Sequence, residues 1–401
     1  MGYNGHLVVD MDSHIRQYWD LDRTYKEHMD PAYRETYARF SEASAALKRR
    51  TGDRGFDAFL WPKLPTRPLG VYEAFDAAAA LEAAGDGAAA GDGGSRSSTS
   101  TGVEIDPACN WDPAIRLRDM ETAAVDISVM FPSSADSFCA LRDAGFEAAL
   151  HRAYHRFMHE YCAEAGGRLW WLGASAFRDI AETIDQLRYW AKNDPYFAGM
   201  SIPRSCPDGS MLDNPDIHPL YAASQELDLP LWVHSGANRP PFTPWTDAPN
   251  GLYHAIGGQY AAAALIGGGV FDMFPRLRIG LFESFSGWMP YLVEKLDDGY
   301  KPGSAAAPKL ARSASEIVAD GNFFCSIEAD EEHIGYAIET LGEHPWLFST
   351  DYPHNGSPWP NGVPIVAGKA IPESAKIMLL GENAKRFLPQ LAGVTAAAAP
   401  A

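Results

Sequence analysis

The sequence has side chains of metal-ligand type at the ends of three short apolar segments. Asp12 and His14 close the segment 7–11, His234 closes a second segment, and Asp351 follows a third. Residues i and i+2 of a strand point to the same face, so one cation can reach both Asp12 and His14. Carboxylate and imidazole donors suit Zn²⁺, Mn²⁺ or Fe²⁺. A single histidine more often packs in a core or lies on the surface, and it is the recurrence at strand ends that indicates a metal site.

Beyond residue 112 the chain alternates between short apolar runs and longer amphipathic patterns. The apolar runs predict strands near residues 126–131, 169–175, 198–203, 230–234, 277–282, 323–328 and 346–350, after an opening strand at 6–11. The amphipathic patterns predict helices near 116–123, 144–165, 179–192, 216–227, 255–273, 286–298, 331–341 and 373–389. Such alternation is typical of βαβ units and a parallel sheet.

Eight strands with interleaved helices predict an α/β fold of the (β/α)8 barrel type, in which functional residues gather at the carboxyl ends of the strands. A doubly wound open sheet is the alternative, although no Gly-x-Gly-x-x-Gly follows an early strand. We expect a single domain over residues 1–392, with an insertion after the first strand at 35–110 and a flexible tail at 393–401. Within the insertion, residues 78–102 are rich in Ala, Gly and Ser, too poor in bulky apolar side chains to offset the entropy of ordering.

The composition excludes several classes of function. The chain has 33 basic and 52 acidic residues, a net charge of −19, which disfavours nucleic acid as a partner. No apolar run approaches the ~18 residues of a membrane span, and the N-terminus lacks a basic-then-apolar signal pattern. The cysteines are scattered, odd in number and without Cys-x-x-Cys spacing, which indicates reduced thiols and a cytoplasmic protein: Cys109, Cys139, Cys162, Cys206 and Cys325.

Barrel closure would bring further polar residues to the same rim. Glu283 ends the sixth predicted strand and can act as a general base, as a ligand of a second metal or as a hydrogen-bond acceptor. His254 lies in a segment leading to the next helix, and His354 follows Asp351 by three residues. If all three turn inward, the site has more donors than one tetrahedral cation uses, which leaves room for a second metal.

Two arginines are candidates for binding a substrate carboxylate. Arg204 comes just after the fourth predicted strand, and Arg239 lies in the loop after His234. A guanidinium can bind a carboxylate through two hydrogen bonds, although a structural salt bridge is the competing interpretation of both. Three other histidines step by four along one predicted helix, and we interpret them as a packed or solvated face: His151, His155 and His159.

The chain resembles the amidohydrolase-related proteins of the aminocarboxymuconate-semialdehyde decarboxylase type. The resemblance is carried, in family order, by residues 9–14, 229–236, 271–277, 282–284, 287–290 and 349–354. It implies a metal-dependent barrel in which Asp12 and His14 match the first-strand ligand pair, His234 the fifth-strand ligand and Asp351 the eighth-strand carboxylate. Members of the family include nonoxidative decarboxylases of aromatic or unsaturated acids, C–C or ester hydrolases and a few iron-dependent oxygenases.

The sequence departs from the family pattern at three positions. The first ligand pair is His-x-His in many members and Asp-x-His here, which adds negative charge and favours a harder metal or a different bridging role. Gln17 stands where a Glu often lies three residues past the motif His. Glu283 stands where a His follows the sixth strand in the well-studied decarboxylases.

These observations favour a metal-dependent lyase or hydrolase that decarboxylates, or cleaves a C–C or C–O bond in, a small carboxylated substrate. Zinc is the metal expected first, and Asp351, Glu283 or His254 would move the proton. One alternative is a dinuclear iron-dependent oxygenase, with His254, Glu283 and His354 as further ligands. Another, suggested by Gln17, is an inactive subunit paired with an active homologue. The resemblance also implies a homodimer or a hetero-oligomer, with subunit contacts or a lid expected at 35–110.

Overall fold

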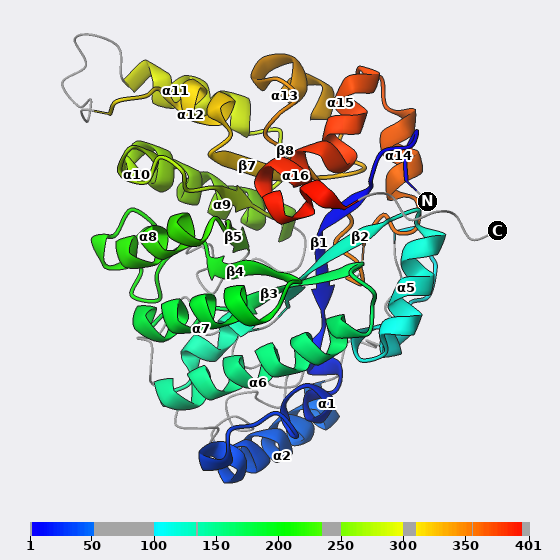
Figure 1. Ribbon diagram of the computed structural model, residues 1–401, viewed down its shortest axis with the longest axis vertical. Coiled ribbons are helices and arrows are strands. Elements are labelled where there is room, and N and C mark those ends of the chain that lie inside the picture. Colours follow the sequence, from blue (N-terminus) through cyan, green and yellow to red (C-terminus); the bar gives the residue numbers. More distant parts are fainter. Residues whose placement is uncertain are drawn as a thin grey trace.

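A computed structural model of the chain describes residues 2–51, 100–133, 135–234, 250–299, 310–354 and 356–394. Eight parallel strands form one sheet, and each pairs with the next in the order of the sequence from β1 to β8 (Figure 1). The strands are β1 (Val9–Ile15), β2 (Ile127–Pro132), β3 (Leu169–Ala174), β4 (Phe197–Pro203), β5 (Leu231–His234), β6 (Ile279–Leu281), β7 (Phe323–Glu328) and β8 (Trp346–Ser349). A doubly wound sheet would reverse its strand order part-way, so the predicted barrel is confirmed.

The barrel closes between β1 and the segment that follows β8. The amide of Asp351 donates a hydrogen bond to the carbonyl of Asp12 over 2.9 Å, and the amide of His14 donates to the carbonyl of Tyr352 over 2.7 Å. We call this pair of hydrogen bonds the β1–β8 seam. It brings the first and last strands of the chain together at their carboxyl ends.

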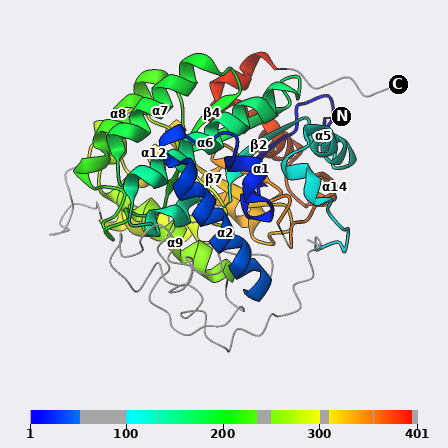
Figure 2. The ribbon, with the colours of Figure 1, turned by 90° about the horizontal axis from the view of Figure 1, so that it is seen from below.

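Helices pack around the outside of the sheet (Figures 1 and 2). They are α1 (Leu21–Tyr25), α2 (Arg34–Thr51), α5 (Pro113–Thr122), α6 (Ala144–Ala163), α7 (Ile180–Asn193), α8 (His218–Leu227), α9 (Asn250–Gly267), α10 (Val270–Met273), α11 (Met289–Gly299), α12 (Ala314–Asp320), α13 (Ile334–Leu341), α14 (Gly362–Gly368), α15 (Glu373–Ile377) and α16 (Asn383–Phe387). A π-helical turn, Met378–Glu382, joins the last two. Short 3₁₀ turns lie at Gln17–Trp19, Pro31–Tyr33, Pro107–Asn110, Ala135–Ala140, Pro215–Ile217 and Pro389–Gly393.

Several predicted boundaries differ from the structure, among them those of the opening strand and of one helix. The opening strand was expected to end at residue 11, whereas β1 continues to Ile15 and is buried throughout. Asp12 and His14 therefore lie inside the strand, where the register against β2 is irregular between Asp10 and Ser13. The helix predicted at 255–273 is divided into α9 and α10, because Gly269 takes a left-handed conformation with φ of 76°.

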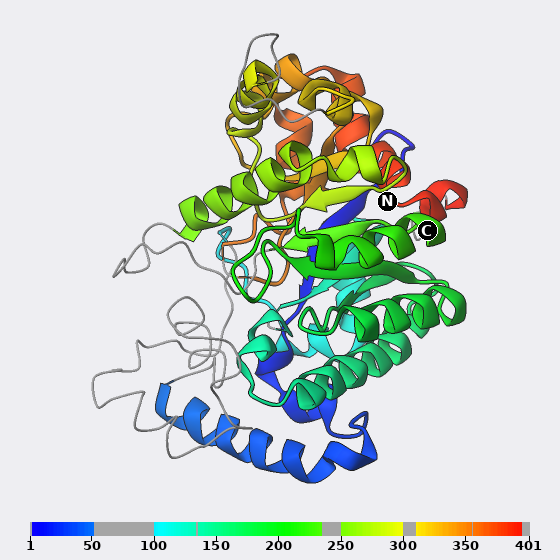
Figure 3. The same ribbon diagram turned by 90° about the vertical axis from the view of Figure 1, so that its left-hand side faces the viewer.

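The described part of the insertion is dominated by α2, which lies at the bottom of Figure 3. Its Phe40 is fully buried and packs edge-to-face on Phe138 and Phe146, with ring centroids 6.1 and 5.7 Å away. Most of the low-complexity segment and nearly all of the predicted tail lie outside the described residues. Among the described helices, none combines the length with the apolar composition that crossing a membrane would require.

Candidate metal centre

The four predicted ligands lie together at the carboxyl rim of the barrel. Nε2 of His14 lies 3.2 Å from Oδ1 of Asp12 and 3.2 Å from Oδ1 of Asp351. Nε2 of His234 lies 3.5 Å from the same Asp12 oxygen. Alternation along β1 sends Asp12 and His14 to one face, while β5 and the seam bring in the other two. Residues more than 300 positions apart in the sequence thus share one cluster.

The donor atoms of this cluster fit a divalent cation. Oδ1 of Asp12 and Nε2 of His14 are buried, and neither has a hydrogen-bond partner among the described residues although the two atoms face each other. Ligand atoms held about 2.1 Å from a tetrahedral cation stand about 3.4 Å apart, close to the separations seen here. A buried carboxylate and imidazole without hydrogen bonds would otherwise be costly. A shared cation accounts for both their spacing and their orientation.

The electrostatics of this side of the rim also favour a cation. Burial lowers the pKa of His14, but the carboxylates of Asp12 and Asp351 outweigh burial and raise that pKa to about 10. Burial alone would raise the pKa of Asp351, yet His354 and His14 hold it well below its usual range. The cluster therefore keeps its carboxylates ionised and surrounds a buried imidazole with their negative charge.

Glu283 occupies the opposite side of the rim, directly after β6. Its Oε2 lies 3.7 Å from Nε2 of His234 and 3.3 Å from Nδ1 of His254. Its backbone has φ of 48°, a left-handed conformation that is uncommon for a residue with a side chain. Burial raises the pKa of Glu283, but the two histidines outweigh burial and lower it. This carboxylate also stays ionised.

Arg204 holds the backbone that carries Glu283. Its Nη2 donates to the carbonyls of Phe282 and Glu283 over 3.1 and 2.8 Å, and its Nη1 lies 3.2 Å from Nδ1 of His254. Arg204 is buried, and α9 packs closely over it, since a Cβ on Gly257 would lie 2.9 Å from the Arg204 Cδ. The guanidinium thus spans the end of β6 and the start of α9.

His354 links Asp351 to the end of β2. Its Nδ1 lies 2.7 Å from Oδ1 of Asp351, and its Nε2 lies 3.2 Å from Oγ of Ser133. The ring of His354 also lies 4.1 Å from that of His14. A hydroxyl, an imidazole and a carboxylate in this order can pass a proton along their hydrogen bonds.

Two groups of three side chains can each hold a metal ion, and they share His14: Asp12, His14 and His234 form the first, and His14, Asp351 and His354 the second. Their donor atoms lie within 4.8 Å of one another in each group. His254 and Glu283 lie beside the first group rather than inside it. The residues singled out in the sequence are therefore brought together, with Arg239 outside the described residues.

The three histidines of α6 take no part in the rim. His155 bonds to the backbone of Ala174 through Nε2, and Nδ1 of His159 lies 2.8 Å from Oδ2 of Asp194. Two buried arginines near β1 were missed from the sequence. Arg16 lies over the ring of Trp19 at 4.3 Å, and Arg116 of α5 donates to the carbonyl of His14. The sequence around Arg116 carries no signal that distinguishes a buried arginine from a solvated one.

Comparisons with known proteins show the family to which the chain belongs. The sequence profile of the family described as amidohydrolase matches residues 98–390, and the chain therefore belongs to that family. A 2-amino-3-carboxymuconate-6-semialdehyde decarboxylase from Dictyostelium discoideum is 27% identical over 298 residues, which cover 71% of this chain and 78% of that protein.

Two solved structures share the fold over nearly the whole chain. The 5-carboxyvanillate decarboxylase of Sphingomonas paucimobilis is 21% identical, with a TM-score of 0.61 and coverage of 96% of this chain and 99% of that one. The 5-carboxyvanillate decarboxylase of Novosphingobium aromaticivorans, with bound manganese and 3-methoxy-4-hydroxy-5-nitrobenzoic acid, is 17% identical, with a TM-score of 0.63 and coverage of 97% and 99%. The predicted family, the barrel and the class of metal-dependent enzyme are confirmed.

Proposed function

We propose that the protein is a nonoxidative, metal-dependent decarboxylase of a small carboxylated substrate with an aromatic or unsaturated system. The observation that carries the proposal is the buried cluster of Asp12, His14, His234 and Asp351, whose donor atoms are spaced for a shared cation. The name of the Dictyostelium relative supports decarboxylation rather than hydrolysis.

We assign Asp12, His14, His234 and Asp351 as the metal ligands. When bound, the cation would hold the substrate carboxylate and a neighbouring oxygen and stabilise the charge that develops as the bond breaks. Zinc was the metal expected from the sequence. The two carboxylates in the donor set and the manganese named for a solved neighbour support Mn²⁺ as an equal candidate.

The reaction needs one proton at the carbon that loses CO₂. The C–CO₂ bond breaks, its electron pair stays on the carbon, and a proton must reach that carbon as CO₂ leaves. We assign this transfer to Asp351, whose ionised carboxylate can accept a proton from His354 over 2.7 Å and pass it to that carbon. His354 and Ser133 form the hydrogen-bonded route behind it. Glu283 and His254, on the other side of the rim, are the second candidates for this role.

The two predicted carboxylate-binding arginines receive different roles. Arg204 already donates to the carbonyls of Phe282 and Glu283, which supports a role in holding Glu283. We therefore favour Arg239 for the substrate carboxylate and keep Arg204 as a supporting residue. Replacing each by lysine separates the roles, since loss of a substrate contact raises KM whereas loss of Glu283 positioning lowers kcat.

A second candidate function is the dinuclear oxygenase. The observation that favours it is the second three-residue group, His14, Asp351 and His354, together with Glu283 lying between His234 and His254. It requires two metal ions per chain, including iron. One metal ion per fully active chain would exclude the oxygenase. Two metal ions per chain, including iron, would favour it over the decarboxylase.

We also propose a cytoplasmic homodimer, or a hetero-oligomer with a homologue. The cysteines among the described residues are free and buried, which suits a reducing compartment. Light scattering on the purified chain measures the assembly. Full activity of the chain purified alone would exclude the inactive-subunit alternative.

The decisive experiment combines metal analysis with CO₂ release. The chain is expressed without added zinc, its metal content is measured, and 5-carboxyvanillate and related aromatic acids are offered with Mn²⁺ or Zn²⁺. We expect metal-dependent CO₂ release that His234→Asn abolishes and that His344→Asn, at an exposed position, leaves unchanged. A protein that binds metal but releases no CO₂ from any carboxylated substrate would contradict the proposal, and oxygen uptake would favour the second candidate.

A further inference from the structure

Arg116 is a fully buried cation that contacts the metal centre through the backbone of the strand that carries His14. It lies in α5. Asp112 caps the N-terminus of this helix, and its side chain accepts a hydrogen bond from the amide of Ala114. None of the surface of Arg116 is exposed, and its partners among the described residues are carbonyl oxygens and a ring rather than a carboxylate. One of its terminal nitrogens, Nη1, has no hydrogen-bond partner there. Burying an unpaired charge costs several kcal/mol, so the other contacts of the guanidinium must offset that cost.

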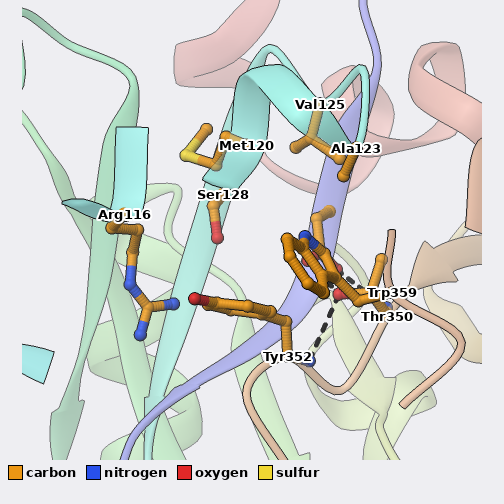
Figure 4. A pocket seen from close by; sticks show the side chains of 9 residues that line it. Arg116, Met120, Ala123, Val125, Ser128, Thr350, Tyr352 and Trp359 are labelled. Atoms are coloured by element: carbon orange, nitrogen blue, oxygen red, sulfur yellow. Dashed lines mark hydrogen bonds between the residues drawn. The ribbon is translucent and has the colours of Figure 1, made fainter. Parts of the chain in front are cut away.

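Those contacts meet at the β1–β8 seam. Nη2 of Arg116 donates to the carbonyl of His14 over 2.7 Å, and the guanidinium carbon lies 5.0 Å from the centre of the Tyr352 ring. Figure 4 shows the guanidinium and the tyrosine pointing toward each other beside a small cavity that both residues line. His14 and Tyr352 are also bonded to each other through the backbone of the seam. Arg116 thus contacts both sides of the same backbone hydrogen bond.

The surrounding residues hold Arg116 and Tyr352 in place. Nε of Arg116 donates to the carbonyl of Cys109 over 3.1 Å, and the hydroxyl of Tyr161 donates to the same carbonyl over 2.6 Å. The hydroxyl of Tyr352 donates to Oδ2 of Asp119, one turn further along α5. A planar guanidinium fixed at Nε can hold the His14 carbonyl in one direction only.

We infer that Arg116 is a positioning residue of the metal centre, which fixes the seam across which His14 and Asp351 face a shared cation. The inference rests on the proposed metal centre. His14 projects from the strand whose carbonyl Arg116 holds, and Asp351 precedes the tyrosine against which it packs. A shift of the seam would change the 3.2 Å separation between Nε2 of His14 and Oδ1 of Asp351. Partners that orient metal ligands in this way commonly contribute 10–100-fold to metal affinity.

The positive charge of Arg116 makes a competing prediction. A cation behind the site repels a metal ion, so removing the charge alone would tighten metal binding. If positioning dominates, Arg116→Met weakens metal binding although it removes that repulsion. The sign of the change in metal affinity therefore separates the two effects.

The test measures the Kd for Mn²⁺ by calorimetry, together with the thermal midpoint of the metal-free protein. The matched control is Arg168→Met, because Arg168 also donates to backbone carbonyls, those of Asp126 and Val125, on the amino-end side of β2. We expect Arg116→Met to raise the Kd by at least about tenfold and Arg168→Met to change it less than about twofold, even where both lower the thermal midpoint.

Each other outcome overturns the inference. An unchanged Kd for Mn²⁺ in folded Arg116→Met would show that the residue contributes only to stability. A lower Kd would show that its repulsion of the metal ion outweighs its positioning of the ligands. If Arg116→Met does not fold, Arg116→Lys takes its place. It keeps the charge but not the planar contacts, so we expect a Kd raised about threefold or more, and a wild-type Kd would reject the inference. Failure of the unmodified protein to bind Mn²⁺ or Zn²⁺ would refute the proposed metal centre itself.

Discussion

The two sides of the rim hold their carboxylates in similar backbone conformations but surround them differently. Asp351 and Glu283 each follow a strand and have positive φ, at 53° and 48°. On the β1–β8 side, Asp351 is joined to β1 by backbone hydrogen bonds and faces imidazoles. On the β5–β6 side, the backbone of Glu283 is held by the side chain of Arg204.

The histidines show what this difference does. Two carboxylates raise the pKa of His14 to about 10. Burial lowers the pKa of His254 to about 4, where the attraction of Glu283 is opposed by Arg204. One side therefore concentrates negative charge suited to a cation, and the other combines a neutral imidazole with a fixed guanidinium. This comparison supports the proposal that the first side binds the metal, with Glu283 and His254 on the second side as the alternative source of the proton.

The largest expected effect comes from removing charge on the metal-binding side. Asp12→Asn keeps the shape of the side chain but removes the charge of a buried ligand. We expect the Kd for Mn²⁺ to rise more than about 1,000-fold, beyond the 10–100-fold typical of residues that only support a ligand. Equilibrium dialysis with elemental analysis measures it. Near-normal metal occupancy in Asp12→Asn would show that the metal binds elsewhere, and the contrast between the two sides of the rim would then be wrong.

Glu283→Gln tests the other side. If Glu283 serves the proton rather than the metal, we expect kcat to fall about 100-fold while the Kd for Mn²⁺ stays within about threefold. Steady-state CO₂ release and the same dialysis measure the two quantities. A loss of metal comparable to that of Asp12→Asn would instead make Glu283 a ligand and support the dinuclear alternative.

The barrel and its functional rim were predictable because the buried strands are short apolar runs, and several of them end in or are followed by a polar residue. That pattern fixes strand number, and the fold then places strand ends at one rim. The extent of β1 was not predictable by the same rule. Its last residues include Asp12, Ser13 and His14, which the barrel buries together with the apolar part of the strand.

Other features were missed for different physical reasons. The helix α12 is short, although Ser313 and Glu316 form a capping box that the sequence displays. The break inside the predicted 373–389 helix depends on a tertiary contact, because a Cβ on Gly381 would lie 1.9 Å from the carbonyl oxygen of Leu7. The place of Arg116 depends on a strand a hundred residues away, and nothing local distinguishes a buried arginine from a solvated one.

A smaller effect is expected from Arg204→Met, which removes the hydrogen bonds to Phe282 and Glu283. Each bond from a charged donor contributes about 1.5–3 kcal/mol, so we expect about 3 kcal/mol less stability in urea unfolding. The Kd for Mn²⁺ should change less than in Asp12→Asn, because Arg204 does not hold the β1–β8 seam. Equal losses of metal affinity in the two variants would show that the sides are not independent.

The smallest expected effect is a pH dependence of stability on the β5–β6 side. The pKa of His254 is about 4 in the folded protein, below the ordinary 6.5, chiefly because the ring is buried. The unfolded chain therefore takes up a proton first as the pH falls, so stability is full above pH 6.5 and declines toward pH 4. Between pH 7 and 4.5 this residue accounts for a loss of about 2 kcal/mol of stability.

His254→Asn should remove that part of the decline, whereas His344→Asn, at an exposed position, should not. Urea unfolding at both pH values measures the free energy of unfolding. If that free energy falls equally with pH in His254→Asn and in the unmodified protein, the fold does not keep the His254 imidazole neutral.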